Sequence, residues 1–427
     1  MFNIKITDFA RNVLTLMTGS TIAQAILMAS TPILTRIYTP DDFGLVAIYV
    51  SLASVLSIVA TGRYEMAIIL AEKQQESDDL TLISIFIATG VAFLSLIIVV
   101  VFDRQIINLV ANEDIAMWLY FIPISVLAAG LYQSFNYWLN RKKLYRDLSQ
   151  GRVISSVTNV STAAAIGFSR VLTNGMVVGS ILSNVITATF YGRKVLSHGF
   201  HPNVDKNKVS RYLKKYYKLP LFQLPNALVD GVRQSVVNIF IGRFFGIEIL
   251  GFYSLALKML MLPSALVGGA ISQVFYQKLS GMHNNGEITF SFVCRFVLKL
   301  LLLSLPFYLL LYYFAIDLFE IFFGKNWAVS GEVVKELMPW FYLMLVSSSI
   351  STVYIVFGKQ AYLFGLSLVY LFVPIVSIIY NASNIFDALI WMNIGMSSVL
   401  IVMIILALKF SYNESENIKL KVFDEIK

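Results

Sequence analysis

The sequence is poor in charged residues. Asp, Glu, Lys and Arg make up only 14% of its 427 residues, against about 25% in soluble globular proteins. Its apolar fraction is 57%, whereas soluble domains have about 45–50%. This balance excludes a soluble globular enzyme, a disordered chain and a fibrous protein. It predicts a multi-pass membrane protein of about a dozen spans, each of about 20 residues, joined by short loops.

Residues needed for several kinds of catalysis are also missing. The single cysteine, Cys294, excludes an internal disulfide and any cysteine-based zinc or iron–sulfur framework. The sequence has no P-loop, no H-E-x-x-H and no C-x-x-C pattern. We therefore predict no catalytic residue, no metal site, no organic cofactor and no enzymatic activity.

Twelve apolar segments are the candidate membrane spans, and the fifth is short. Six lie in the first part of the chain, near residues 12–33, 43–62, 80–102, 115–139, 153–168 and 171–190. Six follow near residues 219–242, 249–275, 293–316, 337–358, 361–380 and 386–408. Most are long enough to cross a hydrocarbon core of about 30 Å.

The basic residues predict how the spans are oriented. If the N-terminus is cytoplasmic, the inner segments hold 23 Lys and Arg residues and the outer loops hold 6. This is the bias expected of cytoplasmic loops, and it places both termini in the cytoplasm. It also accounts for the net charge of +8, so we predict no nucleic-acid partner.

A repeated motif divides the spans into two halves. Residues 36–45 read RIYTPDDFGL and residues 243–252 read RFFGIEILGF, at an offset of 207. Six spans per half predict parallel repeats around an axis along the membrane normal, with the substrate path between them. The alternative is two independent helix hairpins with similar turns.

The predicted fold is therefore an all-α polytopic membrane protein. About 12 transmembrane helices form two six-helix lobes related by a parallel pseudo-two-fold repeat. The predicted parts are an N-terminal lobe (1–190), a basic cytoplasmic linker (191–218), a C-terminal lobe (219–408) and a cytoplasmic tail (409–427).

Ionisable residues within the spans are the strongest functional signal. A charge there costs about 2.5–3.5 kcal/mol on insertion scales, so it tends to face a cavity or a partner. Arg233 and Lys258 each lie nine residues from a span end, or about 14 Å deep. Asp230 lies one turn from Arg233. Polar residues recur at helical spacing along the seventh segment: Gln223, Asn226, Asp230, Arg233, Gln234 and Asn238.

We interpret this stripe as one wall of an aqueous, net positive cavity. The alternative is that Asp230 and Arg233 only neutralise each other between packed helices. Lys258 has no counterpart charge in that alternative, which favours the cavity. We predict cavity roles for Arg233, Lys258, Asp230, Asn226 and Gln234.

Four further charges have weaker signals. Arg295 and Lys299 begin the ninth segment, where they are candidates for the cavity or for snorkelling to the inner surface. Glu65 ends the second segment beside Arg63, where the simplest interpretation is an interfacial pair.

Three stretches of the first half carry a family resemblance. They are TPILTRIYTPDDFGLVAIY (31–49), ATGRYEMAIIL (60–70) and LYQSFNYWLNRKKLYRDLSQGRVISS (131–156). These resemble the Wzx-type polysaccharide flippases of the multidrug/oligosaccharidyl-lipid/polysaccharide exporter superfamily. The resemblance is dense over about the first 160 residues and looser afterwards.

The resemblance implies a function. It implies translocation of undecaprenyl-diphosphate-linked oligosaccharides from the inner to the outer leaflet of a bacterial cytoplasmic membrane. The product would feed a surface polysaccharide such as O-antigen (lipopolysaccharide), capsule or exopolysaccharide. Arg233 and Lys258 would contact the diphosphate, and Asp230 or Glu65 are candidates for a coupling H⁺ or Na⁺. Implied partners are membrane lipids, the polysaccharide polymerase and chain-length proteins.

Two other classes stay open at this point. A multidrug/cation or sugar secondary transporter would share the two six-helix repeats, although the loop GRYEMAIILAEKQQESDD (62–79) lacks the usual sugar-transporter motif. A membrane polymerase or glycosyltransferase acting on the same lipid carrier would need a larger outer loop than the roughly 20 residues at 317–336.

Overall fold

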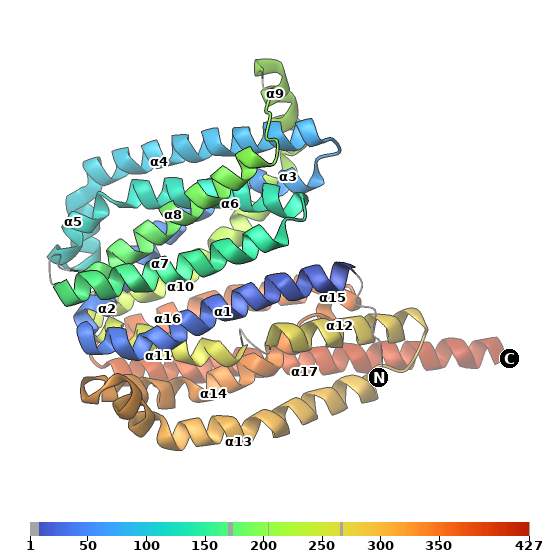
Figure 1. Cartoon of the computed structure of the whole chain (residues 1–427). Helices are drawn as coiled ribbons and strands as arrows, with labels where there is room; N and C mark the ends of the chain where they lie inside the picture. Colours follow the sequence, from blue (N-terminus) through green and yellow to red (C-terminus); the bar gives the residue numbers. More distant parts are fainter. Residues whose placement is uncertain (1–7, 170–173, 204, 265–267, 427) are drawn as a thin grey trace, which may run out of the picture. The chain divides into compact units, whose positions relative to one another are not determined.

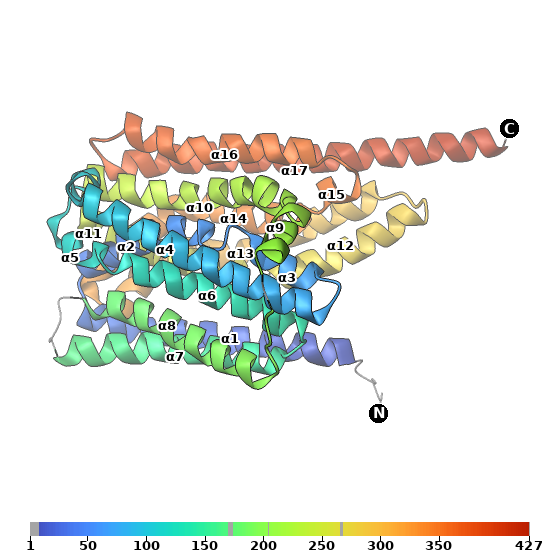
Figure 2. The same ribbon diagram turned by 90° about the horizontal axis from the view of Figure 1, so that it is seen from above.

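The computed structural model describes residues 8–169, 174–203, 205–264 and 268–426. Helices make up almost all of this part, and none of its residues lies in a β-strand. Every one of the twelve predicted segments overlaps a helix. The all-α prediction is therefore confirmed, and Figures 1 and 2 show the helices.

Two compact units make up the chain, the first ending at Gly251 and the second beginning at Phe252. The border between the units follows the helix Lys218–Phe245 rather than preceding it, because this helix packs against helices of the first unit. The predicted lobes follow the sequence repeat instead, and their boundaries stay a prediction.

The first unit contains the following elements, several of which pack as antiparallel neighbours. They are α1 (Asp8–Ile37), α2 (Pro40–Val59), η1 (Tyr64–Met66), α3 (Ala67–Leu70), α4 (Gln74–Val110), η2 (Glu113–Ile115), α5 (Ala116–Leu119), α6 (Ile122–Arg141), α7 (Tyr145–Ser169), α8 (Gly175–Ser197), α9 (Lys206–Lys215), α10 (Lys218–Phe245) and the start of α11 (Ile247–Pro263). Its main packed pairs are α7 with α8, α1 with α7, α4 with α6, and α2 with α10.

The second unit continues from α11. It contains α12 (Gly269–Asn284), α13 (Phe290–Phe323), η4 (Lys325–Trp327), α14 (Ala328–Ile350), α15 (Val353–Val356), α16 (Gln360–Tyr380) and α17 (Ile385–Ile426). Here α14 packs against α13 and α17, and α16 packs against α17. Figure 2 shows α17 continuing well past the end of α16.

Seven described helices are long and apolar enough to cross a membrane. An eighth span is reached if the pair Glu113–Leu119 and Ile122–Arg141, bent by 50°, counts as one. The protein is thus a multi-pass membrane protein, and the count of twelve stays a prediction. Helices α1, α7 and α10 fall outside the seven, and less apolar spans of this kind are expected beside an aqueous path.

The first copy of the repeated motif forms the corner between α1 and α2. Thr39 caps α2, because its hydroxyl accepts from the Asp42 amide at 3.4 Å while the Asp42 carboxylate accepts from the Thr39 amide at 2.9 Å. Pro40 stands at the first helical position, where no amide hydrogen is needed. Tyr38 donates to the carbonyl of Ala163 at 2.7 Å and fixes the corner to α7. The motif therefore acts as a structural corner.

The two copies of this motif touch each other reciprocally. Gly44 lies so close to Ile247 that an added Cβ would be 2.8 Å from its Cγ1 and nearer still to its carbonyl oxygen. Gly251 lies equally close to Pro40, 2.6 Å from its carbonyl carbon by the same measure. Gly44 and Gly251 are equivalent at the offset of 207, and so are Pro40 and Ile247. Reciprocal contact between equivalent residues is the signature of a two-fold axis.

Candidate functional site

The polar stripe of α10 divides into residues that pack and residues that are open. Asn238 donates to the Ser51 hydroxyl of α2 at 2.9 Å, and Ser235 is 3.2 Å from Ser54. Gln234 is exposed and Arg233 is half-buried. Asn226 and Asp230 are helical, but their side chains lie outside the described part of the structure. The C-terminal half of the stripe therefore joins α10 to α2, and Gln234 in its middle part is exposed.

Lys258 lies near the middle of an apolar helix, and its side chain is exposed. Its neighbours Leu255, Ala256 and Leu257 are all buried. Lys258 therefore lies off the packed face of α11 that these three residues form. Lys258 belongs to the second unit and Arg233 to the first, so a cavity shared by the two stays a prediction.

Glu65 occupies a buried turn after α2. Its side chain is fully buried, its Oε2 accepts from the Thr61 hydroxyl, and its Oε1 is 3.6 Å from the Arg63 guanidinium. That Oε1 accepts no hydrogen bond from the residues described. An interfacial pair of these two residues was the simplest expectation; the structure forms the pair and also buries the carboxylate beside a half-buried arginine.

The backbone of this turn is strained. Gly62 and Arg63 both have positive φ, of 57° and 64°. For arginine this left-handed conformation costs about 1–2 kcal/mol. Strain of this kind gathers at functional sites, where the surroundings over-determine the geometry. Here the turn folds Glu65 back into the helix bundle.

Arg295 and Lys299 line a basic pocket between α12 and α13. The pocket has a volume of about 490 Å³ and is lined by Lys278, Met282, Glu287, Ser291, Phe292, Arg295, Phe296 and Lys299. All three cations and Glu287 are exposed. The Arg295 Nε donates to the Ser291 carbonyl at 3.1 Å, and Lys278 lies 5.2 Å from the centroid of the Phe292 ring. Three cations face one acid, so the basic pocket suits an anion.

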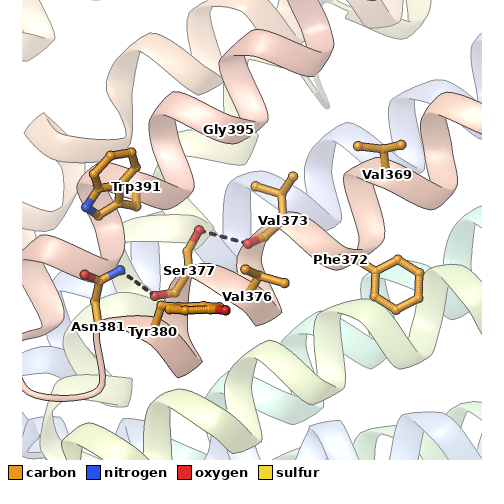
Figure 3. A pocket seen from close by; sticks show the side chains of 9 residues that line it. All are labelled: Val369, Phe372, Val373, Val376, Ser377, Tyr380, Asn381, Trp391 and Gly395. Atoms are coloured by element: carbon orange, nitrogen blue, oxygen red, sulfur yellow. Dashed lines mark hydrogen bonds between the residues drawn. The ribbon is translucent and has the colours of Figure 1, made fainter.

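A second pocket lies between α16 and α17 and is apolar. Its volume is about 720 Å³. Figure 3 shows Val373 and Val376 among its walls, with Trp391 and Tyr380 near Asn381. The side chains of Ser377 and Asn381 donate hydrogen bonds to the backbone carbonyls of Val373 and Ser377, respectively. These walls suit an apolar occupant such as a lipid chain.

A buried acidic tract at residues 76–79 holds the linker to the first unit. Glu76 accepts from the Lys215 ammonium at 2.8 Å and from the Tyr216 hydroxyl at 3.0 Å. Asp79 accepts from the backbone amide of Asn203 at 2.7 Å. The pKa of Lys215 is raised above its ordinary 10.5, first by its hydrogen bond to Glu76 and then by that to Glu72. Figure 1 shows the anchored helix α9 standing out from the bundle beside the start of α4.

Sequence reasoning missed several of these features. The predicted spans left Lys278 in a loop. In the structure it lies on α12, which packs beside α13 so that Lys278, Arg295 and Lys299 line one pocket. The acidic tract had a visible signal, because residues 76–79 hold three acids and both this loop and the basic linker were predicted to lie on the same side of the membrane. Gly286, with φ of 69°, closes α12 and turns the chain into α13, which is why the cations meet.

The fold is similar to that of solved transport proteins. The lipid II flippase MurJ, in an inward closed conformation, matches with a TM-score of 0.74 at 12% identity, covering 96% of this chain and 91% of that chain. An inward-facing multidrug resistance MATE family transporter of the MOP superfamily matches with a TM-score of 0.64 at 12% identity, covering 94% and 96%. These neighbours are transporters rather than enzymes, as the sequence predicted.

The chain belongs to the polysaccharide biosynthesis protein family, whose sequence profile matches residues 33–332. The teichuronic acid biosynthesis protein TuaB of Bacillus subtilis (strain 168) is 24% identical over 281 residues. That match covers 66% of this chain and 57% of TuaB, so the chain spans less than two thirds of that relative. The family resemblance seen in the sequence is confirmed.

Proposed function

We propose that this protein is a flippase for lipid-linked oligosaccharides. It moves undecaprenyl-diphosphate-linked repeat units from the inner to the outer leaflet of the bacterial cytoplasmic membrane, for assembly of a surface polysaccharide. The observation that carries the proposal is Lys258, an exposed cation on an apolar helix whose adjacent residues are buried. Membership of a polysaccharide biosynthesis family with a flippase-like fold supports it.

The chemistry of the substrate explains the charge. A diphosphate and its sugars do not cross a hydrocarbon core unaided, because each polar group loses its water there. Arg233 and Lys258 would replace that water around the diphosphate, since guanidinium and ammonium groups bind phosphate oxygens strongly. Asn226, Gln234 and Asp230 would face the sugar hydroxyls. The lipid tail would stay in the bilayer while one half moves against the other.

We propose Glu65 as the group that couples transport to an ion. Its buried Oε1 accepts no hydrogen bond from the described residues, and a buried polar atom of that kind needs an explanation. A proton or Na⁺ would satisfy this oxygen, and Arg63 at 3.6 Å would respond to the change in charge. Asp230 is the second candidate.

The orientation follows from the positive-inside count. Both termini would be cytoplasmic, and so would the linker with α9. The polysaccharide polymerase and chain-length proteins would take over the product at the outer face. Neither partnership enters the site proposed above.

The decisive experiment is deletion in the native host, followed by leaflet-resolved analysis of lipid-linked oligosaccharides. Complete units should accumulate on the cytoplasmic face, and surface polymer should disappear. Complementation with Arg233→Ala/Lys258→Ala should fail although the protein inserts, whereas the exposed control Lys325→Ala should restore export. Normal export from the double variant would refute the cavity assignment.

A drug or cation transporter is the second candidate, because a MATE family transporter shares the fold. A transporter of cationic substrates is expected to place acids along the path, whereas the positive charge of Lys258 would repel such substrates. In the same deletion strain this alternative predicts an unchanged distribution of lipid-linked oligosaccharides. Units that reach the outer leaflet unpolymerised would instead indicate an assembly enzyme.

A further inference from the structure

The basic pocket lies outside the α10 stripe, and its lining has more basic than acidic side chains. Among the residues that the structure describes, none of Lys278, Arg295 and Lys299 forms an ion pair with an acid. Glu287 is the single acid of the lining, and it accepts from the Asn285 side chain at 3.2 Å. The pocket therefore keeps its positive charge.

Its walls are held firmly in place. Phe275, buried on α12, stacks on Phe292 of α13 and packs at a tilt against Phe296, with ring centroids 5.6 and 4.5 Å away. The amides of Thr289 and Phe290 both donate to the Ser415 hydroxyl of α17, at 3.1 and 3.0 Å. The start of α13, and with it Arg295 and Lys299, is thus fixed before any ligand arrives, which lowers the ordering cost of binding.

An exposed apolar stripe continues from the cations along α13. Residues three and four apart share a helix face, and Arg295 and Lys299 are followed on theirs by large exposed side chains. These are Leu302, Leu303, Leu309, Leu310 and Tyr313. A ligand that satisfied both parts would have an anionic head and a long apolar chain.

The depth of the cations agrees with such a ligand. Arg295 and Lys299 lie two and six residues after residue 293, where the predicted ninth span begins, which places them about 3 and 9 Å deep along the helix axis. Lysine and arginine at this depth reach the headgroup level with their long side chains. Basic pockets between transmembrane helices on the cytoplasmic side are suited to anionic lipid heads.

We infer that the basic pocket binds the phosphate of a lipid, with the lipid chain lying along the exposed stripe of α13. Two lipids share this chemistry: a resident anionic phospholipid, and the lipid diphosphate carrier. The second source rests on the proposed function, and the first does not. Met282, Phe292 and Phe296 would contact the first carbons of either lipid.

The test measures lipid binding to the purified full-length protein by native mass spectrometry. The variant Lys278→Ala/Arg295→Ala/Lys299→Ala is compared with Lys206→Ala/Arg211→Ala/Lys214→Ala, which removes three exposed cations from α9. The probe is phosphatidylglycerol, with phosphatidylcholine as the uncharged reference. One cation near an anionic headgroup contributes about fivefold in affinity, so the pocket variant should lose on the order of 100-fold. The α9 variant should bind like the parent.

A variant that is expected to bind more tightly distinguishes loss of the site from misfolding. Glu287 is exposed, and Glu287→Lys replaces the single acid of the pocket with a fourth cation. It should bind phosphatidylglycerol at least about fivefold more tightly than the parent. Parent-like affinity in both the triple variant and Glu287→Lys would overturn the inference.

Competition with farnesyl diphosphate separates the two sources. Displacement of phosphatidylglycerol from the parent assigns the pocket to the carrier head, and no displacement assigns it to a resident phospholipid. Export by the triple variant is measured separately in the deletion strain. Lost phospholipid binding with normal export would support the lipid site and leave the flippase proposal to its own test.

Discussion

The reciprocal contact between Gly44 and Gly251 makes a quantitative prediction. Alanine at either position would place a Cβ against backbone atoms of the other corner, not against a side chain that can turn away. The nearest backbone carbon would be 2.9 Å from the Cβ at Gly44 and 2.6 Å from that at Gly251, whereas carbon atoms pack favourably at about 3.5–4.0 Å. Each substitution therefore has to separate the corners by about 1 Å.

Two opposing free energies decide the result. Overpacking of this kind costs about 1–3 kcal/mol, and replacing glycine by alanine inside a helix returns up to about 1 kcal/mol. Gly44→Ala and Gly251→Ala should each destabilise the protein by about 1–2 kcal/mol. Because both substitutions open the same contact, the double variant should lose less than the sum.

Gly90→Ala in α4 is the matched control. A Cβ there would meet no atom within 4 Å, so only the helical gain remains, and this variant should be stabilised by up to about 1 kcal/mol. The assay is thermal unfolding in detergent, followed by tryptophan fluorescence from the buried Trp118 and Trp138. Shifts of about 2–4 °C per kcal/mol are expected, downward for the corners and upward for the control. If both corner variants melt like Gly90→Ala, the close reciprocal contact does not exist.

Three further predictions follow from single contacts. Tyr38→Phe removes the hydrogen bond to Ala163 and should cost about 1 kcal/mol in the same melting assay, whereas an unchanged melting temperature would show that the bond is dispensable. Lys215→Met should expose α9 to trypsin several-fold faster than the parent does, and equal cleavage would contradict the anchor. Since the pKa of Lys215 is raised, its contribution is complete below pH 10.5 and lost only at higher pH, so the ratio of Lys215→Met cleavage to parent cleavage should be the same at pH 7 and pH 9. Glu65→Gln should fold normally and make export in vesicles insensitive to an imposed H⁺ or Na⁺ gradient, and retained sensitivity would remove Glu65 from the coupling role.

Much of the fold could be predicted because its signals are local. Apolar runs identify helices one at a time, so all twelve predicted segments overlap helices. The repeated corner was visible as a motif. Gly44 and Gly251 occupy equivalent positions in its two copies, and these copies contact each other in the structure. The residues of the predicted polar stripe all fall within one helix, α10, for the same reason.

The rest depends on neighbours that are distant in sequence. Asn238 had the spacing of a cavity residue, yet Ser51, 187 residues away, accepts its hydrogen bond. Glu65 had the position of an interfacial residue, yet the positive φ of Arg63 turns it into the bundle. No periodicity in the sequence encodes a left-handed arginine or the choice of a partner helix.

The docking of α9 has a mechanical consequence. Residues 191–218 were predicted to form a basic linker, and in the structure Glu76 and Asp79 attach this stretch to the first unit. The chain then passes from one compact unit to the next at residues 251 and 252, inside α11. A loop would dissipate twist and displacement, whereas a hydrogen-bonded helix transmits both along its axis. The two units are therefore joined by continuous helical backbone rather than by a loop, and Lys258 lies on that same helix, seven residues after Gly251.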